Sequence, residues 1–124
     1  LVNRGANLAV RDMEGATPLI ISCMHGYKEI AEYLLTYNVD IEASTISNNT
    51  ALLWASLEGH SDIVISLLEH GAVLDHRNNL GESPLLVAAS HGYLGVMKVL
   101  IERGASIEET DDENLTALHR SAGY

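Results

Sequence analysis

The stretch ATPLIISCMHGY, residues 16–27, carries the end signals of one short helix. Thr17 can accept a hydrogen bond from a free backbone N–H of the first turn, and Pro18 follows at the one helical position where a missing N–H costs nothing. Gly26 suits the left-handed conformation that ends a helix. A helix this short is marginal by itself, so it must pack against something else in the chain.

The same pattern returns at a constant interval. Its four copies start 33 residues apart: TPLI at Thr17, TALL at Thr50, SPLL at Ser83 and TALH at Thr116. The turn glycines keep the same step: Gly26, Gly59 and Gly92. A fixed period of this length is typical of stacked repeat architectures, in which each unit buries its apolar face against its neighbours.

Each unit also holds a second helix. Apolar residues at helical spacing predict it over residues 28–37, 62–70 and 95–103, and Asn38, Gly71 and Gly104 are expected to end it. A polar loop then leads to the next capping residue. The predicted fold is therefore an all-α repeat solenoid of stacked antiparallel helix pairs.

Equivalent apolar positions should form ladders through the stack. One ladder is Leu19, Leu52, Leu85 and Leu118, and another is Leu8, Ile41, Leu74 and Ile107. Small residues would let the first helices approach closely: Ser22, Ala55, Ala88 and Ser121, beside Cys23, Ser56, Ala89 and Ala122. We interpret Cys23 as a small core residue rather than a reactive thiol, because no His or Asp partner is placed beside it.

Charge and composition exclude several function classes. The 124 residues carry 7 Lys and Arg against 17 Asp and Glu, a formal net charge of −10, which argues against nucleic acid and anionic membrane surfaces as partners. The longest apolar runs are too short to cross a bilayer, so no membrane insertion is expected. A single cysteine cannot form an internal disulfide, which favours a reducing intracellular location in cytoplasm or nucleus.

With these features in one frame, the chain resembles the ankyrin repeat family. The resemblance rests on GATPLIISCMHGYKEIAEYLLTYNVDI, NTALLWASLEGHSDIVISLLEHGAVL and ESPLLVAASHGYLGVMKVLIERGASI. It implies a curved stack of antiparallel helix pairs, with β-hairpin-like loops projecting as fingers and the first helices lining the concave side. It also implies a protein-binding function without catalysis, cofactor or metal, and we expect a monomer.

The chain departs from the family pattern in places. The family's His three residues after the cap is kept only at His119, and Ile20, Leu53 and Leu86 are expected to substitute packing for its hydrogen bonds. Asn48 and Asn114 replace the loop glycine, a conformation that Asn tolerates. Thr45 and Asn78 stand where Asp12 and Asp111 begin the other loops.

The repeat frame divides the chain into one array. We expect the end of a truncated repeat at 1–11, complete repeats at 12–44, 45–77 and 78–110, and the start of a truncated repeat at 111–124. Because neither end carries the polar outer face of a terminal repeat, the sequence reads as a cut from a longer array, or as an array with covered ends.

No catalytic constellation is visible. His25 and His91 share a repeat position two units apart, too far to share a metal, and His70 and His76 are expected to be solvated. Glycines lie at turns, in neither a phosphate-loop nor a dinucleotide pattern. The acidic run EETDDE, residues 108–113, is either a solvated loop or a docking edge for a basic partner.

A partner is expected at the finger tips and on the exposed side of the first helices, where the repeat is free to vary. The finger candidates are Met13, Glu14, Ile46, Ser47, Asn79, Leu80, Glu82, Asp112, Glu113 and Leu115. The first-helix candidates are Met24, His25, Trp54, Leu57, Glu58 and His91. Contiguous apolar surface would mark an interaction site, but the same residues could instead pack against neighbouring fingers.

Three functions remain open at this point. The favoured one is a scaffold that binds a protein or peptide through the concave face and the finger tips, with a basic partner as one option. Trp54 is either an anchor in that groove or a side chain partly buried between repeats. The alternatives are a structural spacer within a longer array, and an enzyme whose active site lies on another domain.

Overall fold

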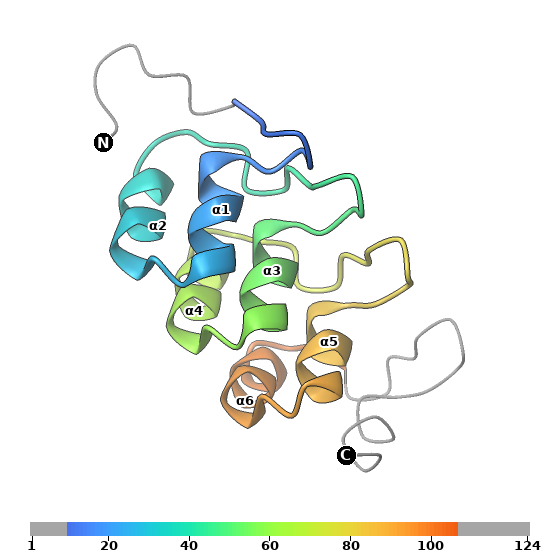
Figure 1. Ribbon diagram of the computed structural model, residues 1–124. Coiled ribbons are helices and arrows are strands. Elements are labelled where there is room, and N and C mark those ends of the chain that lie inside the picture. The colour runs from blue at the N-terminus through green and yellow to red at the C-terminus, as the bar shows by residue number, and fades with distance from the viewer. Residues whose placement is uncertain (1–9, 107–124) are drawn as a thin grey trace.

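A computed structural model describes residues 10–106 of the chain as three stacked helix pairs (Figure 1). The helices are α1 (Pro18–His25), α2 (Lys28–Leu35), α3 (Ala51–Glu58), α4 (Ser61–Glu69), α5 (Pro84–Ser90) and α6 (Leu94–Glu102). Within this range no strand forms, and Ser44 and Thr50 make an isolated antiparallel bridge. The predicted all-α repeat solenoid is confirmed.

The three first helices begin where their capping residues predict. The hydroxyls of Thr17, Thr50 and Ser83 accept from the backbone N–H three residues later, at 3.3, 3.4 and 3.3 Å. Pro18 and Pro84 occupy the first helical position of α1 and α5. These caps satisfy donors that would otherwise be buried without a partner, since all three capping residues are buried.

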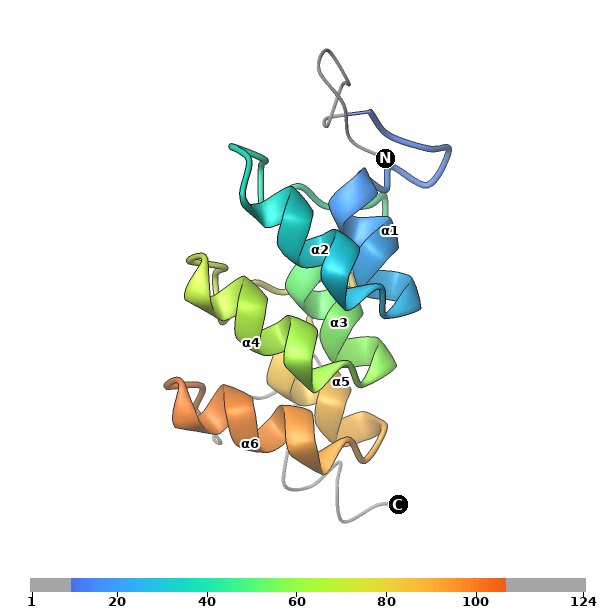
Figure 2. The same cartoon turned by 90° about the vertical axis from the view of Figure 1, so that its left-hand side faces the viewer.

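The turns between the paired helices also follow the prediction. Gly26, Gly59 and Gly92 have φ angles of 76°, 79° and 72°, the left-handed region that closes a helix. Each turn is followed by the second helix of its pair, which runs back along the first (Figure 2).

In the first pair, the second helix ends differently from the prediction. Gly71 and Gly104 are left-handed, with φ angles of 89° and 108°, but Asn38 is not, so the expectation that it replaces glycine here is wrong. α2 ends at Leu35 instead of residue 37, and α4 and α6 begin one residue earlier than predicted. The left-handed conformation costs more free energy for asparagine than for glycine. The backbone hydrogen bonds of this turn therefore differ from those after α4 and α6.

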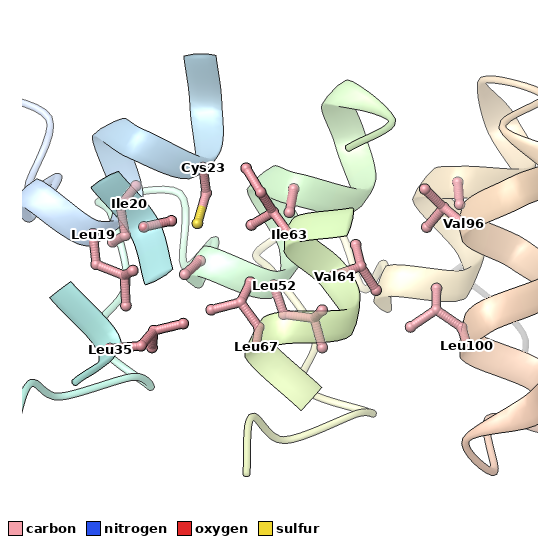
Figure 3. Close-up of a cluster of buried hydrophobic side chains, with 14 of the residues drawn as sticks. Leu19, Ile20, Cys23, Leu35, Leu52, Ile63, Val64, Leu67, Val96 and Leu100 are labelled. Carbon is pink, nitrogen blue, oxygen red and sulfur yellow. The ribbon is translucent and has the colours of Figure 1, made fainter. Parts of the chain in front are cut away.

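Two rows of helices enclose the core. α1, α3 and α5 form one row and α2, α4 and α6 the other, and contacts run within each pair and between neighbours in each row (Figures 1 and 2). Leu19, Leu52 and Leu85 are at most 3% exposed, which confirms the described part of their ladder. Figure 3 shows Leu19 and Leu52 among the aliphatic side chains that lie between the rows, together with the Cys23 sulfur.

Small residues allow the first helices to lie close together. Ser22, Ala55 and Ala88 are buried, as are Cys23, Ser56 and Ala89, as predicted. Ile20, Leu53 and Leu86, which occupy the position of the family histidine, are also buried. Packing therefore replaces the hydrogen bonds that a histidine would make there. The ladder members Leu8, Ile107 and Leu118 lie outside the described residues.

Candidate functional site

The finger loops are built from one repeated tight turn. In the first finger the Gly15 N–H donates to Asp12 O (3.0 Å) and the Asp12 N–H donates to Ala16 O (3.0 Å). The Asp12 carboxylate accepts from the N–H groups of Glu14 (2.9 Å) and Ala16 (2.8 Å). Gly15 is left-handed, with a φ of 85°. Together these bonds fix residues 13 and 14 as the projecting tip.

The third finger reproduces this geometry with an amide. Asn78 Oδ1 accepts from Leu80 N (2.9 Å) and Glu82 N (3.0 Å), so Asn78 replaces the aspartate fully. Glu82 is half-buried, and its carboxylate accepts from Asn78 Nδ2 (3.2 Å). Glu82, one of the predicted contact residues, is therefore part of the internal support of its finger.

The middle finger lacks the side-chain support. The Thr45 hydroxyl is buried and has no hydrogen-bond partner. The backbone turn still closes, because Asn48 donates to Thr45 O (2.8 Å) and adopts the left-handed conformation at φ 64°. Asn48 thus takes the place of the loop glycine, as the sequence predicts. Thr45 makes the backbone hydrogen bonds of the aspartate position but not its side-chain hydrogen bonds.

Neighbouring finger tips are tied together by backbone hydrogen bonds. Ile46 N donates to Glu14 O (2.9 Å), and Asn79 N donates to Ser47 O (3.0 Å). In both bonds the donor lies 32 residues after the acceptor, so the junction is the same. The tips therefore form one continuous edge, which lies on the side of the first helices (Figure 1).

Large apolar side chains project from this edge. Met13 is 97% exposed, Ile46 68% and Leu80 69%. Met13 and Ile46 occupy one repeat position, and Leu80 follows Asn79, which holds that position in the third finger. The turn geometry directs these side chains outward, because their backbone is held by the tip turns. At these three positions the predicted apolar tips are accessible.

The first-helix candidates divide into two groups by burial. His25, Glu58 and His91 are exposed, whereas Met24, Trp54 and Leu57 are partly buried. Met24 and Trp54 pack against the hydrophobic core. The partly buried base of this face is therefore more apolar than the exposed positions His25, Glu58 and His91. Ser47 and Asn79 are exposed at the finger tips, and Glu14 is exposed beside Met13.

Trp54 is partly buried between repeats, which was one of its two expected placements. Its indole Nε1 is covered and has no hydrogen-bond partner. A covered donor without an acceptor costs free energy, because water has been removed and nothing replaces it. Thr45, Trp54 and Ser56, the described residues with such orphaned polar atoms, all belong to the middle unit.

The remaining candidates fall outside the description. Asp112, Glu113 and Leu115, and with them the acidic run 108–113, lie beyond the described residues.

The charged groups around the tips are unevenly distributed. In the first and third fingers Arg11 and Arg77 are hydrogen-bonded to the backbone: Arg11 Nη1 donates to Ser44 O (2.8 Å) and Gly15 O (3.2 Å), and Arg77 Nη1 donates to Gly81 O (2.6 Å). The other basic residues between 10 and 106 are Lys28, Lys98 and Arg103 on or beside the second helices. Glu14 and Glu58 remain exposed on the finger and first-helix side, which is therefore acidic.

The histidines serve packing and turn formation where the structure describes them. His25 stacks on Tyr27 and His91 on Tyr93, with ring centroids 5.5 and 5.7 Å apart. His76 is half-buried, with Nε2 3.2 Å from Asn48 O, so its predicted solvation is wrong. The loop in fact packs on the neighbouring finger. Among residues 10–106 no cluster of three His, Cys, Asp or Glu side chains could hold a metal ion.

A polar hollow of about 270 Å³ lies at the opposite ends of the helices, beside the inter-helix turns. Its lining includes Lys28, His60 and Asp62, none of which the sequence singles out as a site. The His60 ring lies against Gly26 of the preceding turn, and the Tyr93 ring lies against Gly59 in the same way. Each ring therefore packs against the turn glycine of the preceding unit.

The single thiol is part of the core. Cys23 is fully buried, and burial raises the pKa of its thiol to about 12. A thiol with that pKa is protonated at neutral pH, so it is a poor nucleophile. No helix among the described residues is long and apolar enough to span a membrane.

Comparison with known proteins agrees with this architecture. A family profile described as ankyrin repeats (3 copies) matches residues 1–78, and a second, ankyrin repeats (many copies), matches residues 67–120. Protein phosphatase 1 regulatory subunit 27 from Homo sapiens and from Mus musculus are each 46% identical to this chain over 44 residues. The matched segment covers 36% of this chain and 29% of each relative.

Proposed function

Because this chain belongs to the ankyrin repeat family, whose repeats are protein-interaction modules, we propose that it is a non-catalytic scaffold that binds a protein or peptide. The binding face consists of the finger tips and the concave side of α1, α3 and α5. One observation carries the proposal: Met13, Ile46 and Leu80 are all highly exposed along an edge whose tips are hydrogen-bonded to one another. Exposed apolar surface held in a fixed arrangement is the usual signature of an interaction site.

The partly exposed base of this face extends the apolar surface. Met24, Trp54 and Leu57 lie on the first helices, next to the fingers. An apolar base surrounded by exposed tips resembles the composition of interface centres, where tryptophan is over-represented. The partner should therefore insert apolar side chains between the fingers and the helices.

Charge indicates the kind of partner. Glu14 and Glu58 face solvent on this side, while Arg11 donates to Gly15 O of its own finger and to Ser44 O one repeat further on, and Arg77 donates to Gly81 O of its own finger. An acidic rim attracts a basic partner and raises its association rate at low salt. We therefore propose a partner that combines apolar side chains with lysine or arginine.

The test compares two triple variants in affinity capture from a cell lysate. Met13→Asp, Ile46→Asp and Leu80→Asp together disrupt the tips. A matched control, Val73→Asp, Leu94→Asp and Ile101→Asp, adds the same charge at exposed apolar residues away from the tips. Circular dichroism must show that both fold. A partner lost by the first variant and retained by the second supports this face, whereas equal capture by both argues against it.

The single tryptophan supplies a second readout. Once a partner has been captured, a synthetic peptide from it should change the fluorescence of Trp54, because binding alters the surroundings of a partly exposed indole. A peptide that binds without any change in emission would place the contact elsewhere. The affinity should also weaken as salt rises if the partner is basic.

The alternative is that this array is a structural spacer and that binding or catalysis lies in other parts of a longer protein. The relatives are named as regulatory subunits of protein phosphatase 1, so a phosphatase complex is one outcome that the capture can recognise. We further propose an intracellular location, since a buried, unpaired Cys23 suits a reducing compartment.

A further inference from the structure

The end of α2 is not closed as the ends of α4 and α6 are. After α4 the Ala72 N–H donates back to Leu67 O (3.0 Å), and after α6 the Ala105 N–H donates to Leu100 O (3.0 Å). After α2 the equivalent residue, Val39, donates instead to Tyr37 O (2.9 Å). The turn after α2 keeps the bond from Tyr37 N–H to Leu34 O (3.1 Å), which matches that from His70 N–H to Leu67 O after α4, but it lacks the closing bond two residues further on.

Tyr37 lies in this turn, at a position that otherwise carries basic side chains. Its equivalents are His70 and Arg103, which follow the last residues of α4 and α6. A cation there complements the negative end of the helix dipole, and a tyrosine does not. Tyr37 is 43% exposed, and its neighbours Thr36 and Asn38 are exposed as well.

The Tyr37 hydroxyl is held by one other side chain. Its oxygen lies 3.0 Å from the hydroxyl of Tyr33, one helical turn earlier, and the rings meet edge to face with centroids 5.5 Å apart. This hydrogen bond raises the pKa of Tyr37. The pair adds a side-chain link between the last turn of α2 and a turn that lacks one of the closing bonds seen after α4 and α6.

We propose that Tyr37 is a phosphorylation site and that its modification releases the end of α2. A protein tyrosine kinase transfers the terminal phosphoryl group of a nucleoside triphosphate to the phenolic oxygen of Tyr37. The bond from that phosphorus to the bridging oxygen breaks, a new P–O bond forms, the phenolic proton leaves, and a nucleoside diphosphate departs. This inference is independent of the binding face proposed above.

The other described tyrosines are less suited to a kinase. Tyr33 lies inside α2, Tyr27 directly precedes that helix and stacks on His25, and Tyr93 is half-buried against Gly59. Phosphoryl transfer requires that the kinase position the acceptor oxygen in line with the breaking bond. A residue beyond the helix end, in a turn that lacks the last closing bond, can meet that demand with the least unfolding.

The added charge acts against the fold at this point. Phosphotyrosine carries about −1.5 to −2 charges near pH 7, and such a group at a helix C-terminus disrupts the helix end. It also removes the Tyr33–Tyr37 hydrogen bond in its present form. α2 helps to hold the next unit through Glu32, whose carboxylate accepts from the Ser66 hydroxyl at 2.9 Å, so loosening α2 weakens that contact.

The test uses the full chain, ATP and a panel of purified tyrosine kinase catalytic domains, with the modified residues located by tandem mass spectrometry. Synthetic peptides around each tyrosine correct for the intrinsic preference of each kinase. We expect Tyr37 to be modified fastest relative to its peptide, and the Tm of the modified chain to fall by roughly 3–6 °C. Asn38→Gly, which permits glycine closure, should slow modification of Tyr37 severalfold.

Three results would each overturn the proposal. One is that no kinase of the panel modifies Tyr37, or that Tyr27 or Tyr93 reacts faster relative to its peptide. Another is an Asn38→Gly variant that is modified at the wild-type rate. The third is a phosphorylated chain whose Tm is unchanged. Tyr37→Phe serves as the control. Phosphorylation of the other tyrosines in this variant should leave its Tm close to that of the same variant before kinase treatment.

Discussion

The imidazole of His60 lies directly over Gly26, the turn residue of the preceding unit. A β-carbon added at Gly26 would be 2.6 Å from His60 Cε1, well inside van der Waals contact. The glycine is therefore required twice, once for its φ of 76° and once for the space that the ring of the next unit occupies. The same arrangement recurs where Tyr93 lies over Gly59, with a β-carbon distance of 3.0 Å.

Replacing the turn glycines by alanine should separate these two requirements. Gly92→Ala meets no neighbour within 4 Å among residues 10–106 and should cost only the left-handed backbone term, about 1–2 kcal/mol. Gly26→Ala should cost more, roughly 2–4 kcal/mol, because it adds overpacking against His60. Urea unfolding of both variants measures the difference. Combining Gly26→Ala with His60→Ala should recover the excess, and equal costs for the two glycines would contradict the packing argument.

Thr45→Asn should stabilise the protein. Asn78 shows that an amide at this position accepts two backbone N–H bonds within its finger, while the Thr45 hydroxyl accepts none and is buried without a partner. Two new hydrogen bonds should raise the free energy of unfolding by about 1–2 kcal/mol. The reverse change, Asn78→Thr, should lower it by a similar amount. A Thr45→Asn variant with an unchanged urea midpoint would refute this account of the finger.

Asn38→Gly should extend the closure of α2. Glycine can adopt the left-handed conformation of Gly71 and Gly104, so Val39 N–H should then donate to Leu34 O as Ala72 donates to Leu67 O. Amide hydrogen exchange at Val39 should slow severalfold. The matched change Gly71→Asn should speed exchange at Ala72 and cost about 1 kcal/mol. Unaltered exchange at Val39 would show that the turn is set by other contacts.

The stability of the fold should fall at alkaline pH through Cys23. The pKa of its thiol is raised from 9.0 to about 12 by burial, so between these values the unfolded chain loses a proton that the folded chain retains. Stability that is fully present below pH 9 is then lost as pH rises, at up to about 1.4 kcal/mol per pH unit from this group. Cys23→Ala should flatten the decline measured between pH 8 and 10.5. Parallel curves for the two chains would rule the thiol out as a cause.

Local sequence signals predict helix starts here better than loop details. The hydroxyl of Thr17 needs only its own first turn to act as a cap, and the left-handed conformation of Gly26 is intrinsic to glycine, so both could be read without a structure. Whether Thr45 replaces aspartate depends on the length of its side chain, since its hydroxyl is one bond closer to the backbone than a carboxylate oxygen. Only the folded finger shows that the hydroxyl does not make the hydrogen bonds of the carboxylate.

The sequence predicts where the candidate face lies, but not how far its side chains are buried. The repeat frame located Met13 and Ile46 at the tips, because tip residues follow the turn pattern wherever it occurs. The partial burial of Met24 and Leu57 depends on how closely successive first helices pack, which no single unit determines. The hydrogen bond from Arg11 to Ser44 O could not be predicted either, since this acceptor lies one full repeat away.

The repeated tip-to-tip hydrogen bond also fixes the spacing between successive fingers. Each finger is fixed to the next by the same bond, from Ile46 to Glu14 and from Asn79 to Ser47, so successive tips are set at one constant pitch. A ligand whose side chains match the pitch at one junction automatically matches it at the next. Every further contact is then made within an already formed complex, at high effective concentration. The number of fingers that a ligand spans, more than the strength of any one contact, would set how long it stays bound.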